Sequence, residues 1–398
     1  MTQLRAARQA RGWSQARLQA ALRGAAQEAG IQLPGEDSLK TQLSRWENGH
    51  RIPNDFYRQL FRRIYSLTDR ELGFVTTRSD AEAAYSRSTA RVPSIVSFEL
   101  IDSLTATLGQ LSRTDSLAGP VPVLTAATDQ ADFVGRLCQV SAGPERNDLL
   151  ALATRFAEFI GWLHQDDDDL TQAMQWTDRA MDYSQELGDP RLISYVLMRK
   201  SNILTDGGHS AQGRGLADAA LRAAGELTPR LRALALRQRA NAFALLGEAD
   251  GCARELDLAM DEVTREPLDL DDDFLGYCGP SYVEMEAANC WLQLEQPGKA
   301  IPIFERSLGN WPIGHQVRDR GLCLARLATA HAIAGDLDRA AQAGVESLIS
   351  LRIAGSGRVL NQLRQLRLRL APSYDSPSVA AFGQAYVEQF GTTHMLEA

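Results

Sequence analysis

Apolar positions in the first 70 residues recur at the three- and four-residue spacing of short amphipathic helices. The pattern predicts one helix over residues 4–11 and a second that begins with Ser14 as its N-cap. A third helix is expected over residues 38–47, and a fourth follows Pro53 with apolar positions Phe56, Leu60, Ile64 and Leu67. These four helices form a small head.

The third helix of this head carries two kinds of residue. Leu43 and Trp46 are three positions apart and should face the core together. We interpret Trp46 and Glu47 as structural residues, whereas Arg45 and the small polar residues should point the other way. Asn48-Gly49 ends the helix, because glycine readily adopts the left-handed conformation of a C-cap.

These strings resemble the helix-turn-helix head of phage-repressor-type (Xre-family) regulators. The resemblance rests on Leu4–Arg8, Gly12–Gln15, and Leu43–Gly49 with Pro53. Such a head places the N-terminal residues of its recognition helix against base edges in the major groove, and lysine, arginine and glutamine are suited to guanine and adenine. The predicted DNA contacts are therefore Gln15, Arg17, Lys40, Thr41, Gln42, Ser44, Arg45, Asn48, His50 and Arg51. Alternatively, they are solvated polar residues.

The sequence departs from the family pattern between the second and third helices. The family joins them by a tight turn, whereas residues 23–37 add about a dozen positions here. Either the second helix is extended or a loop bulges near the DNA.

Charge separates the head from the rest of the chain. Residues 1–78 hold 13 Arg and Lys against 7 Asp and Glu, although the whole chain of 398 residues carries a net charge of −8. A basic head on an acidic body suggests that the head meets a polyanion. We divide the chain into a head (1–75), a linker with a connecting helix (76–122), a helical array (123–372) and a capping helix with its tail (373–398).

The array is predicted from small residues that recur in triples with offsets of 12 and 7. Helices that cross closely need small side chains at the contact, so each triple predicts one helical hairpin, and a further helix pair is expected near residues 123–150. The triples are Gly161/Ala173/Ala180, Ser201/Gly213/Ala220, Ala240/Cys252/Ala259, Ala288/Ala300/Ser307 and Ala328/Ala340/Ser347.

This spacing, together with Gly335-Asp336 and residues 300–308, resembles tetratricopeptide repeats over roughly residues 145–370. The period is longer than 34 residues, and unit-ending prolines are mostly missing. The resemblance implies an all-α protein whose head precedes a right-handed α-solenoid, as in bacterial regulators that sense quorum peptides.

The resemblance also implies that the first helix of each hairpin lines a concave groove. Inward positions lie at −6, −3, +1 and +4 from the first small residue of each triple, and three successive asparagines occupy +1. An asparagine amide can donate to and accept from a peptide main chain; the alternative is that these residues cap helices or pair with each other. The predicted effector contacts are Asn202, Asn241, Asn289, Arg237, Tyr195, Met198, Tyr282, Met285 and Trp162.

Cysteines, acidic runs and hydropathy limit the possible cofactors and the location of the protein. The five cysteines share no metal-ligand spacing and are expected to be buried thiols. The acidic runs 166–169 and 269–273 are interpreted as solvated loops, with calcium binding as the alternative. We expect no metal and no cofactor. The start of the chain lacks the core of a signal peptide, and no stretch is apolar enough for a membrane helix, so a cytoplasmic protein is expected.

Two functions remain open. The first is a homodimeric transcriptional regulator that reads a pseudo-palindromic operator in double-stranded DNA and responds to a peptide or small-molecule effector. The second is an adaptor whose repeats grip a partner protein while the head tethers it to DNA. An enzyme has little support, because the six histidines are dispersed and no phosphate-binding loop or nucleophile motif is found.

Overall fold

The computed structural model describes residues 2–28, 33, 36–48, 53, 55–65, 67–68, 71–74, 96–265, 275–311 and 317–390. These residues form eighteen α-helices and two short 3-10 helices, and no β-strand is found among them. The predicted all-α class is therefore confirmed. The chain divides into two compact units, Met1–Val92 and Pro93–Ala398.

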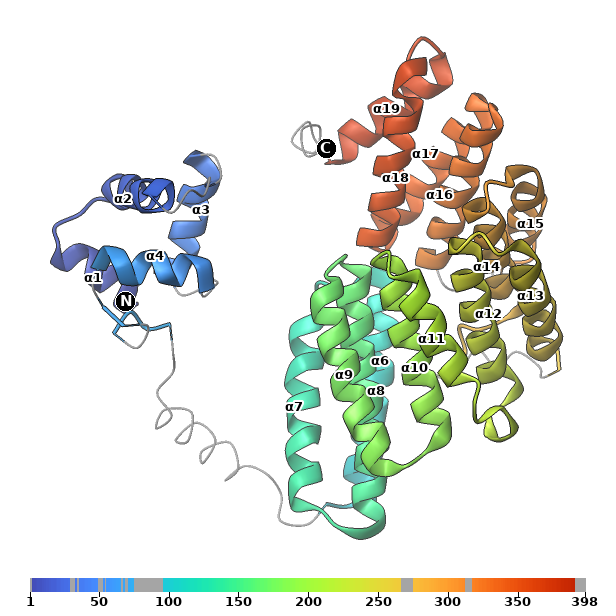
Figure 1. Ribbon diagram of the computed structural model, residues 1–398, viewed down its shortest axis with the longest axis horizontal. Helices are drawn as coiled ribbons and strands as arrows, with labels where there is room; N and C mark the ends of the chain where they lie inside the picture. The colour runs from blue at the N-terminus through green and yellow to red at the C-terminus, as the bar shows by residue number, and fades with distance from the viewer. Residues whose placement is uncertain are drawn as a thin grey trace. The chain divides into compact units, whose positions relative to one another are not determined.

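The first unit contains the four helices predicted for the head (Figure 1). They are α1 (Gln3–Ala10), α2 (Gln15–Glu28), α3 (Glu36–Glu47) and α4 (Asp55–Tyr65). The Ser14 hydroxyl accepts a hydrogen bond from the backbone N–H of Arg17 at 3.1 Å, which confirms the predicted cap. Helix α2 is extended to Glu28 and so takes up part of the insertion; residues 29–32 and 34–35 lie outside the described residues.

The core of the first unit lies between α2, α3 and α4. Leu43 is fully buried and Trp46 is 7 % exposed, as the three-residue spacing predicts. The Trp46 ring packs against Tyr57, with centroids 4.6 Å apart, and meets Phe61 edge-on at 5.8 Å. These aromatic contacts fix the rotation of α3, and with it the face that α3 presents to solvent.

Glu47 joins three segments of the first unit. Its buried carboxylate accepts a hydrogen bond from Arg8 Nη2 at 3.0 Å and another from Gln15 Nε2 at 2.8 Å. Arg8 also donates to the Trp13 carbonyl at 2.7 Å. The hydrogen bond to Glu47 raises the pKa of Arg8. Glu47 therefore has the structural role predicted for it.

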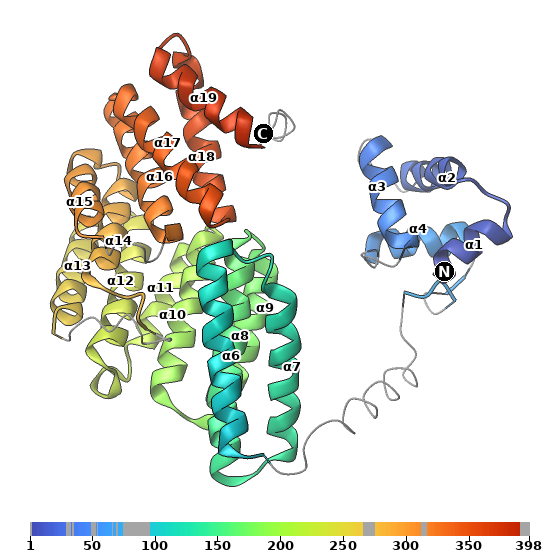
Figure 2. The ribbon, with the colours of Figure 1, turned by 180° about the vertical axis from the view of Figure 1, so that it is seen from behind.

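The second unit is a row of antiparallel helix pairs (Figures 1 and 2). Five pairs, from α8/α9 to α16/α17, follow one another along the chain, and α6, α7, α18 and α19 flank them. The helices are α6 (Phe98–Ala118), α7 (Leu124–Val140), α8 (Gly143–Asp166), α9 (Leu170–Leu187), α10 (Pro190–Asp206), α11 (Ser210–Ala220), α12 (Pro229–Leu245), α13 (Ala249–Val263), α14 (Pro280–Gln293), α15 (Pro297–Gly309), α16 (Val317–Ala334), α17 (Leu337–Ile353), α18 (Gly357–Leu370) and α19 (Pro377–Phe390).

The small-residue triples mark the crossings within these five pairs, as predicted. All fifteen positions are buried. A Cβ atom at Gly161 would lie 2.6 Å from the Thr177 hydroxyl, and one at Gly213 would lie 3.1 Å from the Ser201 carbonyl. The Ser201 hydroxyl donates to the Gly213 carbonyl across the crossing at 2.7 Å. Close packing of backbones thus explains why the positions must be small.

The prediction of an additional helix pair near residues 123–150 is wrong. This stretch holds α7 and the first turns of α8, and α7 packs along α8. Helix α6, which we had placed in a connecting segment, contacts α7, α8 and α16 and belongs to the second unit. The sequence prediction failed because the small-residue rule describes tight hairpins, and α6 and α7 make few mutual contacts.

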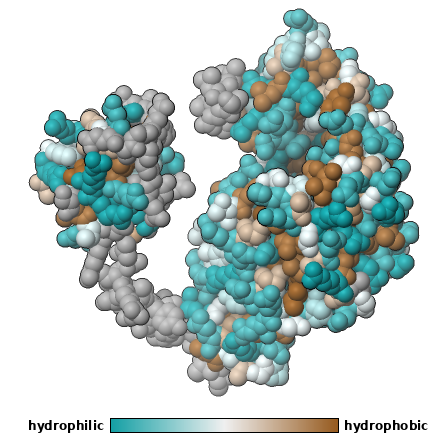
Figure 3. Space-filling view, in the orientation of Figure 1, coloured by the Kyte–Doolittle hydropathy of each residue, from teal (hydrophilic) through white to brown (hydrophobic). Residues whose placement is uncertain are grey.

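All five cysteines are buried free thiols, as expected. Among the described residues, no helix is long and apolar enough to cross a membrane. The visible surface is largely hydrophilic, with single apolar residues scattered over it (Figure 3).

Two glycines of α11 should respond in opposite ways to alanine. Gly215 has no atom within 4 Å of an added Cβ, so Gly215→Ala should stabilise the helix by about 0.5–1 kcal/mol. Gly213→Ala instead places its methyl group 2.7 Å from Thr205 Cγ2 and should destabilise the fold by about 1–3 kcal/mol. Urea unfolding of both variants measures the difference. Equal effects at the two positions would contradict the close crossing of α10 and α11.

Candidate functional site

The second unit contains a cavity of about 480 Å³ that is partly open to solvent. The first helices of all five pairs contribute to its wall, and α6 and α18 complete it. The space-filling view shows a recess between the part formed by α16–α19 and the part formed by α8–α11 (Figure 3). The volume lies within the range of about 300–1,000 Å³ that is usual for small-ligand sites.

The two ends of the helical row are tied together by a cluster of buried charges. Arg318 of α16 donates to Asp115 of α6 and to Asp166 at the end of α8, both at 3.0 Å. Arg358 and the Ser356 hydroxyl, at the start of α18, also donate to Asp166, at 3.1 and 2.8 Å. We call these five residues the closure cluster. It joins the two ends of the row beside the cavity.

Backbone contacts support the same closure. A Cβ atom at Gly119, after α6, would lie 2.6 Å from the Gly355 carbonyl oxygen. A Cβ atom at Gly357 would lie 2.7 Å from the Asp166 carbonyl oxygen. The two ends of the row therefore approach within backbone contact, which only glycine permits at these positions.

Trp162 of α8 stands beside the closure cluster. Its Nε1 donates to Asp115 at 3.4 Å, and the guanidinium carbons of Arg199, Arg318 and Arg358 lie 5.3, 5.2 and 4.4 Å from its ring centroid. Guanidinium groups are attracted to the face of an indole ring at such distances. Trp162 thus separates three like charges that would otherwise repel each other.

Burial and ion pairing shift the pKa values of the closure cluster in opposite directions. Burial raises the pKa of Asp115, although Arg318 opposes the shift. Burial alone would lower the pKa of Arg318, but Asp166 and Asp115 outweigh it and the pKa is raised. Arg318 is therefore charged, and the cluster depends on its guanidinium.

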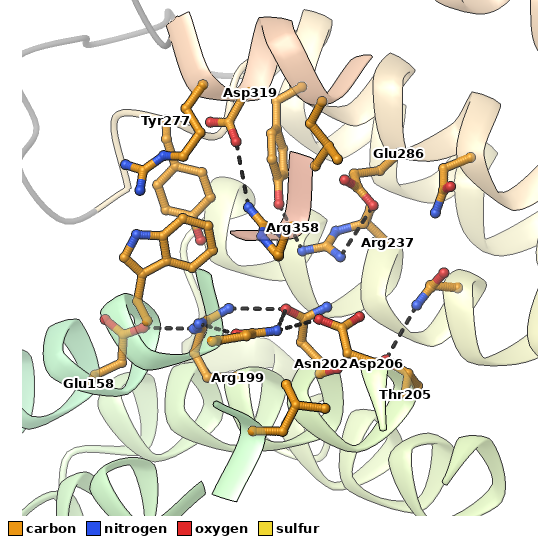
Figure 4. Close-up of a pocket in the computed structure, with 18 of the residues that line it drawn as sticks. Glu158, Arg199, Asn202, Thr205, Asp206, Arg237, Tyr277, Glu286, Asp319 and Arg358 are labelled. Carbon is orange, nitrogen blue, oxygen red and sulfur yellow. Dashed lines mark hydrogen bonds and ion pairs between the residues drawn. The ribbon is translucent and has the colours of Figure 1, made fainter. Parts of the chain in front are cut away.

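A second polar network crosses the cavity from α8 to α10 (Figure 4). Arg199 donates to Glu158 and to Gln165 Oε1, both at 2.7 Å, and to Asn202 Oδ1 at 3.1 Å. Gln165 Nε2 in turn donates to Asn202 Oδ1 at 2.9 Å and to Asp206 at 2.6 Å. All of these bonds except that between Arg199 and Asn202 join α8 to α10, so the network sets the spacing of the two hairpins.

A third network lies on α12, α14 and α16. Glu286 accepts from Arg326 at 2.8 Å and lies 3.8 Å from Arg237, which donates to the Tyr282 hydroxyl at 3.1 Å. Burial would raise the pKa of Glu286, but Arg326 and Arg237 outweigh it and the pKa is lowered. Arg237, which we predicted as an effector contact, is thus engaged within the protein.

Most of the predicted effector residues line the cavity, and two do not. The lining includes Trp162, Tyr195, Asn202, Arg237, Asn241, Tyr282 and Asn289. Met198 and Met285, at the −3 position, are fully buried in hydrophobic clusters, so this part of the prediction is wrong. On α10, α14 and α16 position −2 faces the cavity instead, which brings in Arg199, Glu286 and Arg326.

The three predicted asparagines are not equivalent. The Asn202 side chain is held by Arg199, Gln165 and Gln238. Within the described part of the chain, the Asn241 side chain makes one long hydrogen bond, from Nδ2 to the Thr205 hydroxyl at 3.4 Å. Among the described residues none hydrogen bonds to the side chain of Asn289, although it is only 7 % exposed. Spare hydrogen-bonding capacity is therefore concentrated at Asn241 and Asn289.

The prediction of a solvated loop for the acidic run 166–169 holds for the exposed residues 167–169 and is wrong for Asp166. Asp166 is fully buried in the closure cluster, and Asp169 caps α9 by accepting from the Gln172 N–H at 3.0 Å. Sequence reasoning missed the role of Asp166 because its partners lie 152 and 192 residues away. The run 269–273 lies outside the described residues, and no group of metal-ligating residues is found within the described ranges.

The predicted DNA contacts fall into three groups. Arg17, Lys40 and Arg45 are exposed, and Gln42 and Ser44 are half-buried. Gln15 donates to Glu47 as described, while Asn48 bonds to the Ser44 hydroxyl and to Arg5. The Thr41 side chain, His50 and Arg51 lie outside the described residues. Arg17, Lys40 and Arg45 thus lie on the surface of the first unit.

Comparisons with known proteins find similarity in fold but not in sequence family. No family model and no curated protein matches the sequence. The fold is similar to that of BtubC (BKLC) from P. vanneervenii, with 14 % identity and a TM-score of 0.41 over 65 % of this chain and 95 % of that one. It is also similar to a Rap protein complexed with Competence and Sporulation Factor, with 12 % identity and a TM-score of 0.43 over 73 % and 98 %.

Removing the central cation of the closure cluster should destabilise the second unit strongly. Arg318→Met leaves the carboxylates of Asp115 and Asp166 facing each other, at a cost of about 3–5 kcal/mol at pH 7. The deficit should shrink between pH 7 and pH 5, because the pKa of Asp115 then rises further and protonation removes the repulsion.

Hydrogen exchange of the α16 amides measures this loss in the second unit alone. Arg339→Met is the matched control, because its ion pairs are exposed and contribute less than about 1 kcal/mol. If the two arginine variants were equally stable, the closure cluster would not hold the ends of the row together.

The asparagines at +1 should also differ in their effect on stability. Asn202→Ala removes an acceptor that Gln165 and Arg199 share and should cost about 1–3 kcal/mol. Asn289→Ala breaks no bond and should change stability by less than about 1 kcal/mol. Thermal melting compares the two; similar losses would show that Asn289 has a structural partner.

Proposed function

We propose that this protein is a DNA-binding transcriptional regulator whose second unit takes an effector in the cavity. The effector is a peptide or small signal, and its binding alters DNA affinity through a homodimer. The alternative is an adaptor that grips a partner protein, with the head as a tether to DNA.

The observation that carries the DNA-binding part is the orientation of α3. Leu39, Leu43 and Trp46 anchor one face in the core, while Lys40 and Arg45 are exposed. Lysine and arginine recognise acceptor atoms of guanine, and glutamine suits adenine. Thirteen positive residues against seven negative ones in residues 1–78 add long-range attraction to DNA.

A dimer would present two such helices to successive major grooves. Helix-turn-helix dimers bind half-sites about 34 Å apart, or a multiple of that distance. An effector changes DNA binding only if it binds two arrangements of the protein unequally. Helix α6 is suited to such coupling, because it is the first helix of the second unit and its Asp115 both lines the cavity and bonds to Arg318.

The combined variant Lys40→Ala, Thr41→Ala, Gln42→Ala tests base reading. A duplex selected by the wild-type chain from a random pool serves as operator, and a scrambled duplex of equal length serves as non-specific DNA. We expect the preference for the operator to fall by about tenfold to a hundredfold, because each good base contact contributes about 1–3 kcal/mol. The slope of log affinity against log salt concentration should become shallower by no more than about 1, which is the effect of losing one phosphate contact.

Gln59→Ala is the control, because Gln59 is an exposed residue of α4 outside the proposed surface. Equal loss on operator and scrambled duplex would make residues 40–42 backbone contacts. A wild-type chain that binds no duplex at low salt would support the adaptor instead.

A further inference from the structure

Asp166 and Asp206 occupy equivalent places in successive hairpins. Each is the last residue of its helix, α8 or α10, and each lies five residues after the small residue at its crossing, Gly161 or Ser201. A carboxylate at a helix C-terminus meets the negative end of the helix dipole, so both positions favour a cationic partner.

The two aspartates differ in how this charge is neutralised. Asp166 is fully buried and bonds to Arg318 and Arg358. Asp206 is open to the cavity and accepts one hydrogen bond, from the neutral amide of Gln165 at 2.6 Å. Among the described residues no arginine or lysine forms an ion pair with Asp206. The protein thus supplies two cations at one position and none at the equivalent one.

The other charged groups around the cavity do not neutralise Asp206. Burial by the walls of the cavity raises the pKa of Asp206, and the more distant Arg358 and Arg326 do not overcome it. Six arginines and six carboxylates line the cavity, so the lining offers no spare cation to Asp206.

A second, independent feature of the cavity also lacks a partner. Asn289, on α14, is more than nine-tenths buried and lines the cavity without a hydrogen bond from the described residues. A buried polar group without a partner is unfavourable in an empty protein. An amide side chain offers both a donor and an acceptor, which complements a peptide group or a comparable ligand amide.

We propose that Asp206 receives the ammonium group of the effector and that Asn289 bonds to an amide group of the same ligand. This inference rests on the proposed effector cavity and names the chemical class of its ligand. The class is a short amine with a neighbouring amide, and its ammonium group is either the N-terminus of a peptide or a primary amine on a side chain. The bound ammonium is the cation that the equivalent Asp166 receives from arginine.

Without a bound ligand, the unpaired carboxylate of Asp206 should lower the stability of the protein. Asp206→Asn removes an uncompensated charge and keeps an acceptor for Gln165, so the empty variant should melt at the same temperature as the wild-type chain or higher. Binding residues that lower stability are a common trade-off. A lower melting temperature of the empty variant would give Asp206 a structural role and overturn the proposal.

The binding test uses the full chain and three pools of random tetrapeptide amides. The first pool has free N-termini and no lysine or arginine, the second is the same pool N-acetylated, and the third is N-acetylated with one lysine. Each pool is incubated with protein, separated by gel filtration, and the retained peptides are quantified by mass spectrometry. The first and third pools distinguish an N-terminal ammonium from a side-chain amine.

We expect the wild-type chain to retain members of the first or third pool at least tenfold over the second, and Asp206→Asn to lose this retention by at least tenfold. Asp168→Asn is the matched control, because Asp168 also presents an exposed carboxylate to the cavity, and asparagine tolerates its positive φ of 65°. Equal retention of all three pools, no retention of any pool, or an equal loss in both variants would overturn the proposal.

The assay contains no DNA, so its outcome is independent of the proposed regulation. Retention of amines without any effect on operator affinity would leave the amine site in place and contradict the regulator. Normal operator binding with no retained peptide would overturn the amine site alone.

Discussion

The geometry of the second unit depends on one buried carboxylate, Asp166, and the two arginines that neutralise it. Arg318 and Arg358 come from α16 and α18, at the far end of the helical row, and both reach the last residue of α8. A buried ion pair adds little net stability over a well-packed apolar contact. Separating its partners is costly, however, because each buried charge is then left unpaired. The closure cluster therefore specifies one register of the two ends, and that register shapes the cavity between them.

The size of the cavity limits what it can hold. A volume of about 480 Å³ favours a short ligand over a long extended segment. The polar networks of the wall are largely satisfied internally, as at Asn202 and Arg237. The few groups that are not satisfied, Asp206 and Asn289, then dominate selectivity, because a ligand gains most where the protein has left a charge or an amide without a partner.

The sequence was informative wherever a requirement repeats or acts locally. Small side chains at each helix crossing predicted all five hairpins, and the spacing of Leu43 and Trp46 predicted the orientation of α3. It failed where geometry is not local. A small rotation of the helices moved Met198 and Met285 into the core, and the pairing of Asp115 with Arg318 spans 203 residues, which no periodic pattern reveals. The cavity wall was thus predicted in outline, whereas its closure was not.

The central claim is that the closure cluster holds the two ends of the row in one register. Nitroxide labels on Ala106 of α6 and Gln365 of α18, both exposed, can be attached through engineered cysteines because the native thiols are buried. Pulsed electron paramagnetic resonance should give a single narrow distance distribution in the otherwise wild-type chain, and a broad distribution shifted to longer distances in Arg318→Met. A broad distribution without that substitution, or identical narrow distributions with and without it, would contradict the account.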